Sequence, residues 1–200
     1  MPLILASASP RRAELLRAAG IDPVICPVEC DETWHPGETP KAYARRVADN
    51  KADLAVRPCS RVLAADTTVW TEAKLAPIGK PRDRAEARSI LRMLLRTGQH
   101  FVTTAFAIVD TQGEQTRWHH GMTTTRVLMR ALDDDALERT LGRYLDTDEW
   151  RGKAGGYAIQ GHAAGLVRLI EGSYTGVVGL PVAEVLDALD ALDALDGNHL

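Results

Sequence analysis

The sequence has 200 residues, of which 45% are hydrophobic and 26% are charged, a composition typical of a folded globular chain. The formal net charge of −3 excludes a generally basic nucleic-acid coat protein, although basic residues outnumber acidic ones in the first half of the chain. Three cysteines do not indicate a secreted disulfide framework, and no apolar run reaches the ~18 residues of a membrane span.

The N-terminal segment MPLILASASPRR has no basic region before its apolar residues, so it does not read as a signal peptide. We therefore expect a cytoplasmic protein that binds neither membranes nor nucleic acid. Cys26, Cys30 and His35 lie close together in the sequence. No second pair of ligands follows at a zinc-ribbon spacing, so we expect no zinc site there.

The apolar pattern predicts alternating strands and helices. Residues 3–6 read as a short buried strand, and Ser9 and Pro10 as the cap and first residue of a helix that stops at Gly20. The pattern predicts further strands at 24–28, 61–65, 101–109, 118–129 and 165–170, and helices at 40–55, 84–95, 133–145 and from 181 to the end. A turn at 110–113 makes 101–109 and 118–129 an antiparallel pair. This order predicts an α/β protein with a mixed sheet.

The C-terminal segment repeats Leu-Asp-Ala every three residues over 186–195. A helix has 3.6 residues per turn, so a leucine stripe with a period of three winds away from the core face. We therefore expect a frayed, acidic helical tail over 186–200. An acidic partner-binding tail is the alternative.

Two hydroxyls and two guanidiniums meet at the start of the first predicted helix. Ser7, Ser9, Arg11 and Arg12 lie between the first strand and this helix, whose free N–H groups favour anions. Arginines in a first turn oppose the helix dipole, which favours an anion site over a plain cap with solvated side chains.

Two further candidates follow predicted strands or turns. Asp66 and Thr67 come after the apolar residues 62–65, and ligand sites gather where the strands of an open α/β sheet end. A carboxylate there can bind a metal or take a proton from water, whereas the plain alternative is a turn-starting aspartate. Lys80 lies on a Gly-Lys-Pro turn without a Walker context, so it either reaches a phosphate or is solvated.

The Gly-rich segment 152–161 ends in Gln160 and Gly161. Glycines let a backbone approach a ligand, and a Gln side chain can read a base edge, although a Gly-Gly pair also makes an ordinary turn. Glu32 belongs to an acidic cluster suited to a divalent ion or simply to solvent. Lys51 would by default point to water. The sequence shows no nucleophile paired with a base, so we do not expect covalent catalysis.

Together these segments resemble the Maf family of nucleoside triphosphate pyrophosphatases. The resemblance rests on LILASASPRR at 3–12, Asp31-Glu32-Thr33, Lys51-Ala52, LAADT at 63–67, Gly79-Lys80-Pro81, GKAGGYAIQG at 152–161 and GSYTGVVGLP at 172–181. The segments occur in the family's order and cover nearly the whole chain.

The resemblance implies one domain over 1–200, a two-lobed α/β fold with a long mixed sheet and a central cleft, related to the inosine triphosphatase fold. It implies hydrolysis of a nucleoside triphosphate to the monophosphate and pyrophosphate with Mg²⁺ or Mn²⁺. Asp66 matches the proton acceptor and, with Glu32, a metal site. Ser7, Ser9, Arg12, Lys51 and Lys80 match polar cleft residues that bind the substrate. Family members commonly form homodimers.

Three positions separate the family's branches, and Arg11, Thr67 and Gln160 match the branch that prefers dTTP and UTP. A Gln amide offers both a donor and an acceptor to a pyrimidine, whereas the Glu of the other branch only accepts. CTP and modified pyrimidine nucleotides are further candidate substrates. Two alternatives stay open: a 7-methyl-GTP pyrophosphatase, and a nucleotide-binding regulator of cell division and septum formation.

Overall fold

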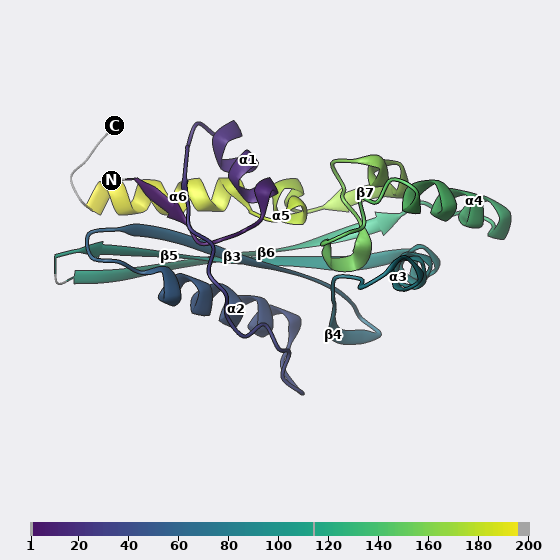
Figure 1. The fold of residues 1–200 in the computed structure, drawn as a ribbon, viewed down its shortest axis with the longest axis horizontal. Helices are drawn as coiled ribbons and strands as arrows, with labels where there is room; N and C mark the ends of the chain where they lie inside the picture. The colour runs from purple at the N-terminus through teal and green to yellow at the C-terminus, as the bar shows by residue number, and fades with distance from the viewer. Residues whose placement is uncertain (1, 114, 196–200) are drawn as a thin grey trace.

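A computed structural model describes residues 2–113 and 115–195 (Figure 1). Its sheet has the strand order β2-β1-β3-β5-β6-β7, with β4 paired to β3. The strands are β1 (Leu3–Leu5), β2 (Val24–Ile25), β3 (Arg61–Thr71), β4 (Lys74–Ile78), β5 (Gln99–Gln112), β6 (Gln115–Met129) and β7 (Val167–Glu171). The β1 strand is parallel to β2 and β3, and every other pairing is antiparallel. The predicted α/β fold with a mixed sheet is confirmed.

Helices cover both faces of the sheet (Figure 1). One face carries α1 (Pro10–Ala18), α5 (Tyr174–Val178) and α6 (Val182–Leu195), and the opposite face carries α2 (Pro40–Ala55). At the far end lie α3 (Arg84–Thr97) and α4 (Asp134–Leu145), with 3₁₀ turns at Ala154–Gly156 and His162–Leu166. Within the described part of the chain, no helix is both long enough and apolar enough to span a membrane.

Alternation along β3 sends successive side chains to opposite faces of the sheet. Leu63 and Ala65 join the core under α1 and α6, whereas Val62 and Ala64 pack with residues of α2. The same alternation directs Asp66 toward α2 and Thr67 toward α1. The central strand therefore delivers two polar neighbours to two different layers.

One edge of β3 is left open beside these two residues. β1 pairs with β3 only as far as Leu63, and β4 pairs with β3 from Val69 onward. After Leu5 the chain turns away into the loop that leads to α1. The site thus opens where a parallel strand ends, but Asp66 itself lies inside an 11-residue strand. The prediction that Asp66 follows the end of a strand is wrong, because β3 continues along β5, where small Ala105 lies opposite Asp66.

The structure differs from the predicted elements in three further places. Strand β4 and the short helix α5 were not predicted. Of the predicted turn at 110–113, residues 110–112 belong to β5, because the buried Asp110 carboxylate accepts a hydrogen bond from Arg61 inside the sheet. Such pairing lets a turn-forming residue stay within a strand.

The C-terminal helix is docked over its described length. Val185, Ala188, Leu189 and Leu192 are buried in the core beneath α1. These four positions follow an i, i+3, i+4, i+7 pattern on one face, which holds α6 against the core. The leucine repeat itself turns outward at its end, where Leu195 is 69% exposed. Asp193 also pairs with Arg61 of β3. The predicted frayed tail is therefore wrong for 186–195, and its remainder, 196–200, lies outside the described residues.

Candidate active site

A pocket of about 320 Å³ opens at the gap beside β3, a size suited to a small-molecule ligand. The loop before α1, the central part of β3, α2, the Gly79–Lys80 turn and the Gly-rich segment all contribute to its lining. Every site residue predicted from the sequence lines this pocket: Ser7, Ser9, Arg11, Arg12, Glu32, Lys51, Asp66, Thr67, Lys80 and Gln160.

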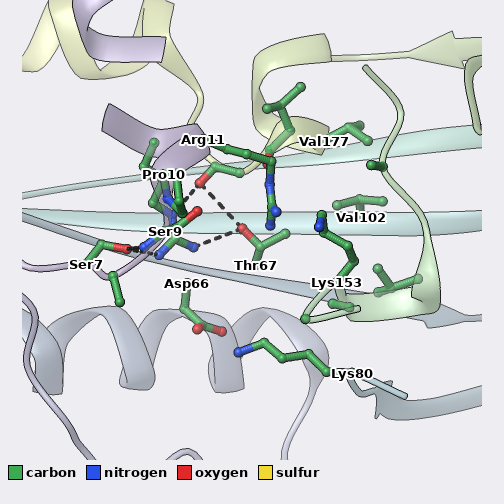
Figure 2. A pocket seen from close by; sticks show the side chains of 18 of the residues that line it. Ser7, Ser9, Pro10, Arg11, Asp66, Thr67, Lys80, Val102, Lys153 and Val177 are labelled. Carbon is green, nitrogen blue, oxygen red and sulfur yellow. Dashed lines mark hydrogen bonds between the residues drawn. The ribbon is translucent and has the colours of Figure 1, made fainter. Parts of the chain in front are cut away.

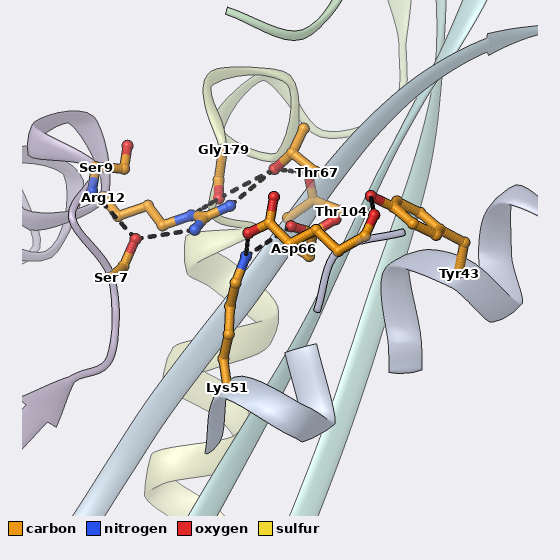
Figure 3. Close-up of polar contacts among 10 residues, drawn as sticks. Ser7, Ser9, Arg12, Tyr43, Lys51, Asp66, Thr67, Thr104 and Gly179 are labelled. Atoms are coloured by element: carbon orange, nitrogen blue, oxygen red, sulfur yellow. Dashed lines mark hydrogen bonds and ion pairs between the residues drawn. The ribbon is translucent and has the colours of Figure 1, made fainter. Parts of the chain in front are cut away.

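Arg12 ties three parts of the chain together. Its Nε donates to the Gly179 carbonyl at 2.8 Å, Nη1 to Ser7 Oγ at 2.9 Å and Nη2 to Thr67 Oγ1 at 3.2 Å (Figure 3). The side chain is buried. Ser9 occupies the N-cap position of α1, but its side chain makes no capping bond; Ser7 Oγ instead accepts from the Ser9 amide. Arg12 is thus a fixed charge beneath the pocket and not a mobile surface arginine.

A buried lysine joins the two candidate carboxylates. Lys51 Nζ lies 2.9 Å from Asp66 Oδ1 and 2.6 Å from Glu32 Oε1. Lys51 is on the inward face of α2, so the default expectation that it points to water is wrong. We call the group of Asp66, Glu32, Lys51 and Arg12 the carboxylate end of the pocket.

Burial and charge act in opposite directions on these carboxylates. Burial raises the pKa of Asp66 above its ordinary value, even though the charges of Lys51 and Arg12 oppose the shift. Burial would also raise the pKa of Glu32, but the hydrogen bond and charge of Lys51 outweigh it, and the pKa is lowered. Asp66 is therefore the better proton acceptor of the two.

The opposite side of the pocket holds cations that form no ion pair with any carboxylate of residues 2–113 and 115–195. Arg11 Nε donates to the Val178 carbonyl at 3.2 Å, and its guanidinium points into the pocket beside Lys153 (Figure 2). Gln160, from the same Gly-rich segment as Lys153, also lines the pocket and is exposed. We call Arg11, Lys153 and Gln160 the open end. Lys80 lies apart from them, across the pocket and close to Asp66 (Figure 2).

Two residues at the site were not predicted. Tyr43 reads as one apolar position of a helix in the sequence, but its hydroxyl donates to the Glu32 carbonyl at 2.9 Å. Lys153 also lines the pocket, whereas the sequence indicates only that it belongs to the Gly-rich segment. Its place beside glycines was a usable signal, because such segments bring a side chain close to a ligand.

Known proteins are similar to this chain over most of its length. The family model described as "Maf-like protein" matches residues 2–192. A dTTP/UTP pyrophosphatase from Cereibacter sphaeroides is 45% identical over 92% of this chain and 91% of its own length. Another from Rhodospirillum rubrum is 46% identical over 92% and 84%, and one from Ruegeria sp. is 43% identical over 92% and 91%.

Among solved structures, a nucleoside-triphosphatase described as a dITP/XTP pyrophosphatase from Mycobacterium abscessus matches 66% of this chain and 76% of its own. The identity is 15% and the TM-score 0.41, too low to show a shared fold. The expected relation to inosine triphosphatase therefore stays a prediction. The family model matches residues 2–192, and the relatives from Cereibacter sphaeroides and Rhodospirillum rubrum are 45% and 46% identical to this chain. The chain therefore belongs to the Maf family.

Proposed function

We propose that this protein hydrolyses dTTP and UTP to the nucleoside monophosphate and pyrophosphate. The main support is Asp66, a buried carboxylate with a raised pKa that lies among fixed cations in the pocket. The names of the relatives supply the substrate class. A cytoplasmic location and a homodimer stay predictions.

The reaction needs a water molecule, a proton acceptor and a neutralised triphosphate. We propose that Asp66 accepts a proton from water while the water oxygen bonds to the α-phosphorus. The bond from this phosphorus to the oxygen that bridges the α- and β-phosphates breaks, and pyrophosphate leaves with that oxygen. Lys80 and the N-terminus of α1, with Ser7 and Ser9, would hold the phosphates. Arg12 and Lys51 keep the charges around Asp66 in place before the substrate arrives.

The acidic side chains suit a divalent cation that protein and substrate hold jointly. Among the described residues, no group of three His, Cys, Asp or Glu side chains forms a metal cluster. Mg²⁺ commonly takes one or two carboxylates and completes its shell with waters and substrate phosphates. Glu32 and Asp66, on either side of Lys51 Nζ, fit that description. When bound there, Mg²⁺ or Mn²⁺ would neutralise developing charge on the phosphates.

Base recognition is assigned to the open end. The exposed Gln160 amide can accept from the pyrimidine N3–H and donate to a carbonyl. Thr67 contributes differently, because its hydroxyl is already bonded to Arg12 and Thr104. We propose that Thr67 fixes the pocket floor and that Arg11 and Gln160 contact the base.

The decisive experiment measures pyrophosphate release with Mg²⁺ or Mn²⁺ from dTTP, UTP, CTP, GTP and 7-methyl-GTP. We expect dTTP and UTP to lead, and Asp66→Asn to lose activity by about 10²–10³-fold, as for one charged contact that tightens in the transition state. Asp49→Asn on α2, whose side chain does not line the pocket, is the matched control. A lead by 7-methyl-GTP would refute the branch assignment, and binding without turnover would favour the regulator.

A further inference from the structure

Two cations face the same space at the open end. Arg11 reaches it from the first turn of α1, and Lys153 reaches it from the Gly-rich segment; Figure 2 shows their nitrogens side by side. Among residues 2–113 and 115–195, no carboxylate pairs with either side chain. Burial, together with the charge of Arg11, lowers the pKa of Lys153. Glu14 and Glu149 act on Arg11 and Lys153 only from beyond ion-pair distance. Like charges held side by side with no carboxylate in direct contact indicate that a ligand supplies acceptors.

The fold fixes Lys153 in this position. The Gly155 amide donates to the Gly79 carbonyl at 3.2 Å, which ties the Gly-rich segment to the turn that carries Lys80. Gly155 has a φ of +70°, and a Cβ there would lie 3.2 Å from Val69 of β3. Both features favour glycine at the point where the segment docks on the strand. Lys153 Nζ donates to the Arg151 carbonyl at 3.0 Å, and its other N–H groups are available to a ligand.

The surroundings of this pair suit a base better than a phosphate. Val102 and Val177 line the same side of the pocket, and such apolar walls match a flat ring. The polar groups proposed to hold the phosphates, Ser7 and Lys80, lie across the pocket with Asp66 (Figure 2). In the proposed reaction the α-phosphate lies beside Asp66, so the sugar and base would extend from there toward the valines.

We propose that Lys153, acting with Arg11, reads the carbonyl edge of a uracil or thymine base and thereby selects it against cytosine. Both side chains only donate hydrogen bonds. Uracil and thymine present a carbonyl acceptor where cytosine carries an amino donor. Two cationic donors therefore favour the first two bases and disfavour the third. This inference rests on the proposed hydrolysis of dTTP and UTP.

UTP and CTP provide the sharpest test, because they share the ribose and triphosphate and differ only on the base edge. We expect Lys153→Met to reduce kcat/KM for UTP by about tenfold and to leave that for CTP nearly unchanged, so that the UTP:CTP ratio falls about tenfold. Lys153→Arg should retain most of the ratio. Lys41→Met on the exposed side of α2 is the control and should keep both values.

The outcomes separate this inference from the proposed function. If the wild-type protein releases no pyrophosphate from either substrate, the proposed function fails. If the wild-type protein is active and Lys153→Met lowers kcat/KM for UTP and CTP by the same factor, Lys153 contacts the triphosphate and the inference is overturned. An unchanged ratio with unchanged rates overturns it as well. Thermal melting of each variant shows whether a lost rate reflects lost folding.

Discussion

The two ends of the pocket are built differently. At the carboxylate end, Lys51 bonds to Asp66 and Glu32, and Arg12 bonds to Ser7, Thr67 and Gly179. At the open end, Arg11 and Lys153 each donate to one backbone carbonyl within the described part of the chain, and Gln160 is exposed. One end is a closed network of charges, and the other has donors left over for a ligand.

This difference matches a division between chemistry and recognition. Charges aimed at a reacting centre act best when they are fixed in advance, because no reorganisation is then needed during the reaction. Groups that read a base need free donors and acceptors instead. Changes at the carboxylate end should therefore alter stability and rate, whereas changes at the open end should alter selectivity.

The largest effect on stability should come from Lys51. We expect Lys51→Met to lower the free energy of unfolding by about 3 kcal/mol, because removing one partner of a buried ion pair leaves an uncompensated charge. The side chains of both Lys51 and Asp66 are only 10% exposed. Urea unfolding at pH 7 measures the loss.

Lys80→Met is the matched control, since Lys80 lines the same pocket but is exposed. It should leave the free energy of unfolding unchanged within about 0.5 kcal/mol. Equal losses in the two variants would contradict the view that only the carboxylate end is a closed network.

The candidate site could be predicted from the sequence to a large extent, because its residues occur in short segments with distinct chemistry. All ten predicted residues line one pocket. What could not be predicted was how they contact one another. Helical periodicity cannot show that the Lys51 ammonium turns inward, because the carboxylates that stabilise it come from strand β3 and from a loop.

The elements of the fold were predictable where the apolar periodicity is strong. They were less predictable where contacts between distant residues determine the extent or packing of an element. The helix 40–55 was predicted with its observed bounds, and the antiparallel strands near 101–129 were recognised. The strand character of Asp66 and Asp110 was missed, because their buried partners Lys51 and Arg61 are distant in the sequence. The packing of 186–195 was missed for the same reason: α6 docks on a core made by other segments.

A second prediction concerns a buried histidine that contacts a residue of the pocket wall. His100 on β5 is fully buried, and its Nε2 lies 2.7 Å from the hydroxyl of Tyr157, which lines the pocket. Burial lowers the pKa of His100 to about 4, below its ordinary value near 6.5. The unfolded chain therefore binds a proton on this residue as pH falls below about 6.5, while the folded protein does not until about pH 4. The contribution of His100 to stability is complete above pH 6.5 and falls by about 3 kcal/mol toward pH 4.

Urea unfolding from pH 7 to pH 4.5 tests this linkage. The free energy of unfolding of His100→Gln should decline less steeply than that of the wild type, by up to about 1.4 kcal/mol per pH unit. His35→Gln is the control, because His35 is exposed. Parallel curves for the wild type and His100→Gln would show that His100 is not the group that titrates.

The smallest effect should come from Tyr43, which positions Glu32 without touching the substrate. Tyr43→Phe removes one hydrogen bond to the backbone of the loop that carries Glu32, while Arg46 still bonds to Thr33 and Glu38. Losing this hydrogen bond should weaken Mg²⁺ binding through Glu32 by about 0.5–1 kcal/mol, which raises the Mg²⁺ concentration needed for half activity by about two- to fivefold. KM for dTTP at saturating Mg²⁺ should hardly change. Tyr174→Phe is the control, because Tyr174 is 45% exposed. A rise in KM for dTTP without a change in Mg²⁺ requirement would show that Tyr43 acts on substrate binding and does not position Glu32.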